Sequence, residues 1–186
     1  VSIAKQNPTK EVVFFAVGFE TTAPANALSV LHAEKEGISN YSILASHVLV
    51  PPAMEAILDD KLCTIDAFLA AGHVCAIMGI QEYYPLVEKY KIPIVVTGFE
   101  PLDLVQGIYM AIKQLEKGQF KLENQYSRIV KEFGNKAAIK VIKQVFEIGN
   151  REWRGIGEIP NSGYVIKEAY RKYDAESKFN ISNIKV

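Results

Sequence analysis

The sequence predicts an α/β fold in which parallel sheets are flanked by helices and form two similar lobes. Unbroken apolar runs rich in β-branched and aromatic residues indicate strands that are buried on both faces of a sheet. Segments with helical spacing of apolar residues separate these runs, and glycine or proline marks most of the boundaries. Strands that alternate with helices build right-handed βαβ units, which is why this fold class is expected.

The first two predicted strands cover residues 12–19 (VVFFAVGF) and 41–50 (YSILASHVLV). A helix is expected between them, because Pro24 fits a first helical turn and apolar residues recur at helical spacing until Gly37. A further short helix is predicted to begin at Pro51. This order of elements predicts one βαβ unit near the N-terminus.

Two further strands are predicted at residues 65–71 and 92–98. The helix expected after them has apolar residues such as Leu104 and Ile108 along one face, and Gly118 ends it. The rest is predicted to be mostly helical, with one helix over residues 123–132 and another over residues 135–146. A glycine-rich loop at residues 153–157 and then a polar tail are expected after them.

Composition excludes several classes of protein. The 21 basic residues balance the 21 acidic ones and 49% of residues are hydrophobic, which disfavours a disordered chain and a basic nucleic-acid binder. The longest apolar run, residues 67–80, is too short to span a bilayer, and the first ten residues contain no signal-peptide core. Two cysteines fit a reducing compartment, so a cytoplasmic protein is expected. The missing initiator methionine suggests a segment of a longer protein.

Polar residues recur where the predicted strands end. The tripeptide GFE follows a strand at Gly18 and again at Gly98, and His47 and His73 stand at or near the ends of the other two strands. The carboxyl ends of parallel strands share one edge of a sheet, and ligands bind there in open α/β folds. The sequence therefore predicts duplicated halves with a cleft at the strand ends.

Glu20, Thr21 and Thr22 are the first candidate site. Two hydroxyls beside the free N–H groups of a helix start form a cradle for an anion or a small polar ligand. The alternative interpretation, which the residues leave open, is that a threonine simply caps the following helix.

His73 and Cys75 are the second candidate, as an activated nucleophile or half of a metal site. No CxxC or HxxxH pattern accompanies them, and a buried cysteine also serves as a small hydrophobic residue. Two functions remain open at this point. One is a self-sufficient thiol enzyme that uses this pair, and the other is a docking module without chemistry of its own.

Further binding candidates are His47, Gly72, Glu100 and Asp103, all near predicted strand ends. Glu100 places a carboxylate at a strand end, and Asp103 lies in the first turn of the following helix. Acidic residues in a first turn are also favoured by the helix dipole, so their function does not follow from position alone.

Several motifs in this sequence resemble those of the HypD family, which are maturation factors of nickel–iron hydrogenases. GFETTAP at residues 18–24 is similar to the family's GFETT motif, and AGHVC at 71–75 is similar to its PxHVS motif. The resemblance covers essentially the whole chain in the family's order. It continues through HVLVPP, VTGFEPLD, ENQYSR, WRGIGEIPNSG and an Asp-Ala pair, at residues 47–52, 96–103, 123–128, 153–163 and 174–175.

The resemblance implies a scaffold that, with a HypC-type chaperone and a HypE-type cyanide donor, holds the iron of an Fe(CN)2CO group during assembly. It implies that Glu20, Thr21, Thr22, His73 and Cys75 carry the chemistry. It also implies a 4Fe-4S cluster, although this chain lacks the family's GPGCPVC segment and its C-terminal cluster cysteines. No metal ligands are therefore expected here. Ala71 and Cys75 replace the proline and serine of PxHVS.

The family's two α/β lobes suggest a boundary near Pro51 and Pro52. Residues 1–55 are then the C-terminal part of a first lobe, and residues 56–186 are a second lobe with a helical C-terminal portion. On this interpretation the earlier strands of the first lobe are missing. The chain is therefore expected to expose apolar surface that self-associates or pairs with the rest of its own protein.

Overall fold

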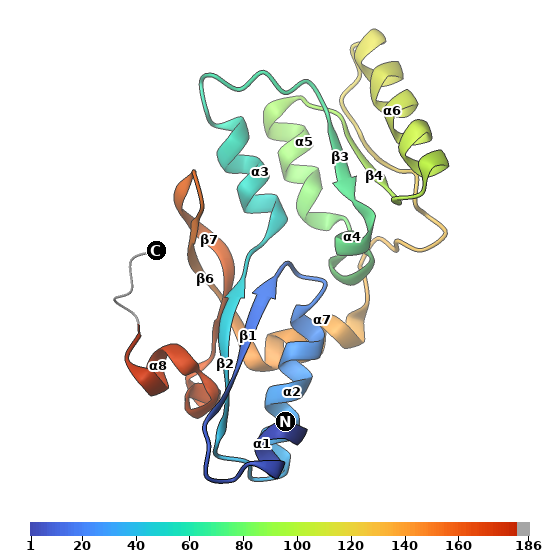
Figure 1. Cartoon of the computed structure of the whole chain (residues 1–186). Coiled ribbons are helices and arrows are strands. Elements are labelled where there is room, and N and C mark those ends of the chain that lie inside the picture. The colour runs from blue at the N-terminus through green and yellow to red at the C-terminus, as the bar shows by residue number, and fades with distance from the viewer. Residues whose placement is uncertain (182–186) are drawn as a thin grey trace. The chain divides into compact units, whose positions relative to one another are not determined.

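The computed structural model describes residues 1–181, which form helices and parallel sheets and confirm the α/β class (Figure 1). They group into two compact units, which are described separately. The first unit contains Val1–Leu49 and the residues from Lys140 onward, and the second contains Val50–Ile139. The sequence suggested lobes of residues 1–55 and 56–186 instead. No helix in the described part of the chain combines the length and the hydropathy that a membrane crossing needs.

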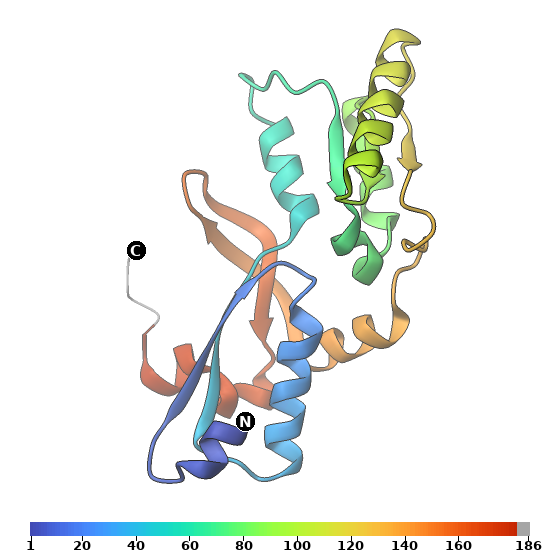
Figure 2. The same ribbon diagram turned by 45° about the vertical axis from the view of Figure 1, so that its right-hand side comes forward.

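The first unit is built on a parallel pair of strands with a helix beside it (Figure 2). Its N-terminal elements are α1 (Ser2–Gln6), β1 (Val12–Gly18), α2 (Ala23–Lys35) and β2 (Tyr41–His47). The strand–helix–strand prediction for this region is confirmed. In the register of the pair, Val12 lies opposite Tyr41 and Gly18 lies opposite His47, so both predicted strand ends meet at one edge.

The C-terminal part of the first unit is an antiparallel hairpin. The glycine-rich loop predicted at residues 153–157 is its turn, whereas the prediction of a polar tail after it is wrong, because a strand and two helices follow. The elements of this part are α7 (Lys136–Val145), β6 (Phe146–Trp153), β7 (Gly157–Ile166), a 3-10 helix η2 (Glu168–Tyr173) and α8 (Ala175–Phe179), of which α7 begins in the second unit. Leu49 N donates to Ser162 O over 2.7 Å, which ties the hairpin to the end of β2. This hydrogen bond is one of the contacts that group the C-terminal residues with the first unit.

The predicted burial of β1 on both faces is wrong. Val13, Phe14, Phe15 and Val17 are between 45% and 59% exposed, whereas Ala16 is buried. Within residues 1–181, β1 pairs only with β2, so its other edge and much of its apolar surface stay open. The chain as a whole was expected to expose apolar surface, and β1 carries such surface.

This surface predicts concentration-dependent self-association of the chain. Replacing Phe15 by Lys is expected to reduce the association, because charged residues protect open strand edges. The free energy of unfolding is expected to change by less than ~0.5 kcal/mol, since the side chain is already exposed. Sedimentation velocity over a range of concentrations measures the first effect, and urea unfolding measures the second.

The neighbouring substitution Ala16→Lys is the matched control, because it places the same charge on a residue that is 1% exposed. It should destabilise the first unit strongly. A wild-type chain that stays monomeric at every concentration would contradict the expectation for Phe15.

The second unit contains a three-stranded parallel sheet in the order β3-β4-β5, with helices around it. Its elements are α3 (Val50–Leu58), β3 (Phe68–Ala71), α4 (Gly72–Met78), a 3-10 helix η1 (Gln81–Tyr83), α5 (Tyr84–Tyr90), β4 (Ile94–Thr97), α6 (Pro101–Glu116) and β5 (Leu122–Asn124). The predicted strands around β3 and β4 and the helix that ends before Gly118 are confirmed. The predicted helix over residues 123–132 is wrong, because β5 and a series of turns occupy it.

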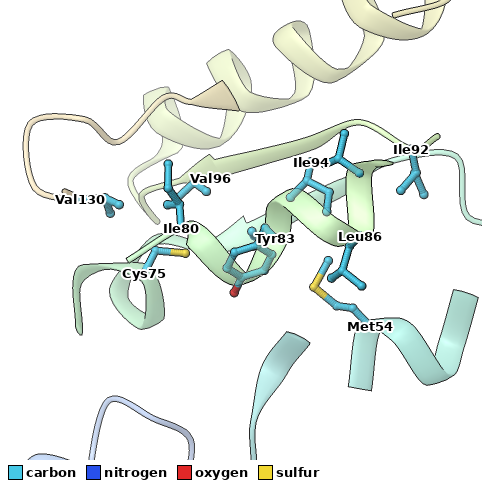
Figure 3. Close-up of a cluster of buried hydrophobic side chains, with 11 residues drawn as sticks. Met54, Cys75, Ile80, Tyr83, Leu86, Ile92, Ile94, Val96 and Val130 are labelled. Carbon is cyan, nitrogen blue, oxygen red and sulfur yellow. The ribbon is translucent and has the colours of Figure 1, made fainter. Parts of the chain in front are cut away.

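The core of the second unit lies on one face of this sheet (Figure 3). Ile94 and Val96 of β4 pack there with Cys75 of α4, Tyr83 and Leu86. The other face of the sheet carries α6, where Gly107 lies against the side chain of Thr97. Side chains alternate along β4, so Ile94 and Val96 face the core while Thr97 faces α6.

Helix α6 packs in an unexpected orientation. Its buried positions are small or polar, namely Asp103, Gly107, Ala111 and Gln114. Its large apolar residues are exposed, including Leu102, Val105, Ile108, Tyr109 and Ile112. Helical periodicity therefore predicted the element correctly but not the face that packs on the sheet.

Candidate functional site

The turn after β1 brings Gly18 and Thr22 into close contact. Gly18 has a φ of +151°, and a Cβ atom there would lie 2.5 Å from Thr22 Oγ1. The Thr22 hydroxyl donates to the carbonyl of Phe19 over 3.2 Å and forms no capping bond, although Thr22 occupies the N-cap position of α2. A glycine at position 18 is therefore required for this threonine to fold back over the strand end.

The three residues of the predicted cradle differ in exposure. Glu20 is 1% exposed, Thr21 is half-buried and Thr22 is exposed. The carboxylate thus lies inside the first unit beside the start of α2, where the positive end of the helix dipole favours an acidic group. The hydroxyl of Thr22 is the member of the set that solvent and ligands reach most easily.

His47 ends β2 and lies inside the first unit, with no exposed surface. Its Nε2 atom is 2.8 Å from the side-chain nitrogen of Asn26, and its ring packs on Phe146 with centroids 5.8 Å apart. Burial, with a smaller contribution from the positive charge of Arg151, lowers the pKa of His47 to about 4. His47 is therefore neutral near pH 7 and links the end of β2 to α2.

His73 has a different environment in the second unit. It lies in the first turn of α4, directly after β3, and its side chain is exposed. The imidazole packs against the ring of Phe99 in a tilted arrangement, with centroids 4.8 Å apart and planes 47° apart, and Phe99 is itself 60% exposed. Ala71 and Thr97 are register partners, so this aromatic pair stands at the adjacent carboxyl ends of β3 and β4.

Cys75 does not share the exposed environment of His73. Residues two apart on a helix point about 200° apart around its axis, and Cys75 accordingly points into the core (Figure 3). It is fully buried among the core residues of the second unit. The structure therefore favours the packed-cysteine interpretation over a thiol–imidazole pair.

Asp103 forms a bidentate ion pair with Arg128. The two guanidinium nitrogens donate to the two carboxylate oxygens over 2.7 and 2.6 Å, and Gln125 Nε2 donates to the first of these over 2.9 Å. The hydrogen bonds from Arg128, followed by the one from Gln125, lower the pKa of the Asp103 carboxyl. Glu100 is 3.7 Å from Arg128, and its side chain is 80% exposed.

Each unit therefore gathers its own set of predicted residues. The first unit holds Glu20, Thr21, Thr22 and His47 around the ends of β1 and β2, and the second holds Gly72, His73, Glu100 and Asp103 around the ends of β3 and β4. Sequence reasoning assigned no site role to Tyr126 and Arg128. The ENQYSR motif that contains them was noted, but it was expected to be helical.

The implied 4Fe-4S cluster needs more ligands than this chain supplies. Such a cluster takes four thiolate ligands, and this sequence contains two cysteines. Among residues 1–181, no group of three or more His, Cys, Asp or Glu side chains is arranged to hold a metal ion. The residues present therefore do not fit the cluster.

Comparison with known proteins agrees with the motifs. The HypD family profile, described as "Hydrogenase formation hypA family", matches residues 1–186. The hydrogenase maturation factor HypD of Rhodobacter capsulatus is 44% identical over 182 residues, which is 97% of this chain and 48% of that protein. The HypD of Escherichia coli is 40% identical over 180 residues, 96% of this chain and 48% of that protein.

The hydrogenase expression/formation protein HupD of Azotobacter chroococcum is similar as well, with 42% identity over 96% of this chain and 49% of that protein. The chain thus spans about half the length of the curated relatives that it matches. The match extends over every motif described above and both units. The chain belongs to the HypD family of hydrogenase maturation factors.

Proposed function

We propose that this chain forms part of a scaffold on which the Fe(CN)2CO group of nickel–iron hydrogenases is assembled. A HypC-type chaperone and a HypE-type cyanide donor are the proposed partners, and the cytoplasm is the proposed compartment. Membership of the HypD family supports a role in hydrogenase maturation. The observation that carries the finer proposal is the turn in which Gly18 lets Thr22 fold over the end of β1.

The chemistry of this turn suits a small anion. Cyanide and cyanide-bound iron carry negative charge, which hydroxyl donors and the N–H groups of a helix start stabilise. The Thr22 hydroxyl now donates to the Phe19 carbonyl, and its rotation toward a ligand exchanges one hydrogen bond for another. Because Thr22 is exposed, this exchange requires no opening of the unit.

His73 is the proposed proton carrier in the second unit. Its imidazole is exposed, and histidine is the side chain that most often serves as a general acid or base. Glu100 or Glu20 is proposed to orient this imidazole. Glu100 belongs to the same unit and is exposed beside Arg128, and Glu20 is buried in the first unit. No step at a 4Fe-4S cluster is assigned to this chain, because its residues do not fit one.

The test uses a chimaera of the E. coli HypD in which this chain replaces the matching 48% of that protein. The chimaera with Thr21→Val and Thr22→Val should lose cyanide and carbon monoxide infrared bands on the purified protein. Hydrogenase activity of the cells should fall on the order of 100-fold, the usual cost of a lost anion-stabilising donor.

Thr9→Val is the matched control, because Thr9 is an exposed threonine of the first unit away from the turn. It should leave both readouts at the level of the unsubstituted chimaera. Undiminished infrared bands in the double variant would disprove the role of the two hydroxyls.

A further inference from the structure

The ring of Tyr126 lies against two glycines, Gly72 and Gly98, that directly precede His73 and Phe99. A Cβ atom at Gly72 would lie 2.6 Å from Tyr126 Cδ1, and a Cβ atom at Gly98 would lie 2.8 Å from Tyr126 Cε2. These two ring carbons lie across the ring from each other. The ring therefore contacts the backbone directly before His73 and the backbone directly before Phe99.

Arg128 holds this ring in place. Its guanidinium carbon is 4.4 Å from the centroid of the Tyr126 ring, a cation–π geometry. Both terminal nitrogens are fixed by the carboxylate of Asp103, whose own oxygen abuts Gly98. The planar guanidinium group suits this double task, because it stacks and forms a bidentate pair at the same time.

The backbone of this segment is fastened as well. The amides of Gln125 and Tyr126 both donate to the carbonyl of Val96, over 3.0 and 3.3 Å. The N-cap residue of α4, Ala71, forms no side-chain capping bond. Two groups pack against Gly72 at the start of α4: the backbone carbonyl of Thr97 and the ring of Tyr126, which is the side chain that touches this turn.

We propose that Tyr126, held by the Asp103–Arg128 ion pair, is a positioning residue that fixes the His73–Phe99 pair at the ends of β3 and β4. The importance of this pair for maturation rests on the proposed function. That Tyr126 positions these two residues does not rest on the proposed function, because it follows from the contacts of the ring. Tyr126 acts through the backbone of Gly72 and Gly98 and needs no contact with a ligand.

The experiment records the imidazole proton resonances of His73 by NMR in the chain of residues 1–186. The nearby ring of Phe99 displaces these resonances through its aromatic ring current. Tyr126→Leu should remove most of that displacement, because the ring no longer separates the two glycines. Tyr126→Phe keeps the ring and should preserve the displacement, and the resonances of His32, in the first unit, should stay unchanged in both variants.

Arg128→Lys provides a second variant, since Arg128 is half exposed and lysine keeps the charge without the planar fork. It should shift the His73 resonances in the same direction as Tyr126→Leu. Unchanged His73 resonances in Arg128→Lys and in a folded Tyr126→Leu would overturn the inference. If Tyr126→Leu does not fold, Arg128→Lys decides alone.

A second readout separates this inference from the proposed function. Arg128→Lys in the chimaera should lower hydrogenase maturation if His73 must be held in place. Displaced His73 resonances together with normal maturation would support the positioning role and contradict the role of His73 in assembly. Unchanged resonances would overturn the positioning role whatever the result for maturation.

Discussion

Gly72→Ala is expected to destabilise the second unit by ~3 kcal/mol or more, the upper range for inserting a methyl group into a packed site. The new Cβ atom would overlap the backbone carbonyl oxygen of Thr97 and approach Tyr126 Cδ1 to 2.6 Å. Because Thr97 is buried at the end of β4, its carbonyl has no free space to enter. Relief of the overlap therefore requires β3 and β4 to separate where they carry His73 and Phe99.

Hydrogen exchange at the amides of β4 measures this effect, because Trp153, the single tryptophan of the chain, reports on the first unit instead. Gly118→Ala is the matched control within the same unit. Gly118 has a φ of +59° but nothing within 4 Å of its Cβ position, so the substitution should cost only the ~1 kcal/mol of a left-handed alanine. Equal protection in the two variants would contradict the predicted overlap.

The parts of the fold that the sequence predicted are those with strong local signals. The apolar runs of β1, β2 and β4 and the proline and glycine boundaries of α2 and α6 are visible without any tertiary information. The hairpin β6/β7 was missed because its strands carry Glu147, Arg151 and Glu152, and their stability depends on pairing with each other. Burial was mispredicted for β1 and α6, since it depends on which elements pack against them.

The candidate site shows the same division between local and tertiary information. The repeated GFE tripeptide placed Glu20 and Glu100 after strands, as the structure does. Helical geometry separates His73 from Cys75, and this was foreseeable only if α4 had been expected to begin at Gly72. The pairing of Asp103 with Arg128 joins residues from α6 and from the turns after β5, so no local pattern predicted it.

Buried His47 makes the first unit lose stability as the pH falls from about 6.5 toward 4. Its pKa in the folded chain is lowered to about 4, so below 6.5 the unfolded state binds a proton that the folded state does not. The free energy of unfolding should therefore decrease with falling pH, at up to about 1.4 kcal/mol per pH unit for one proton. Urea unfolding followed by Trp153 fluorescence at several pH values measures this slope in the correct unit.

His47→Gln separates this contribution from that of the carboxyls. Glutamine does not titrate and can still bond to Asn26, so the variant should be less stable at pH 7 but should show no slope between pH 6.5 and about 5.5, above the range in which the carboxyls contribute. Carboxyls with lowered pKa values, such as Glu34 and Asp103, stabilise the folded chain above their unfolded pKa. This contribution is lost only as the pH falls toward and below that unfolded pKa. His73→Gln removes an exposed imidazole and should keep the wild-type slope. If His47→Gln also keeps the wild-type slope, the prediction is wrong. His47 then does not cause the pH dependence, because it takes up its proton in the folded chain without loss of stability.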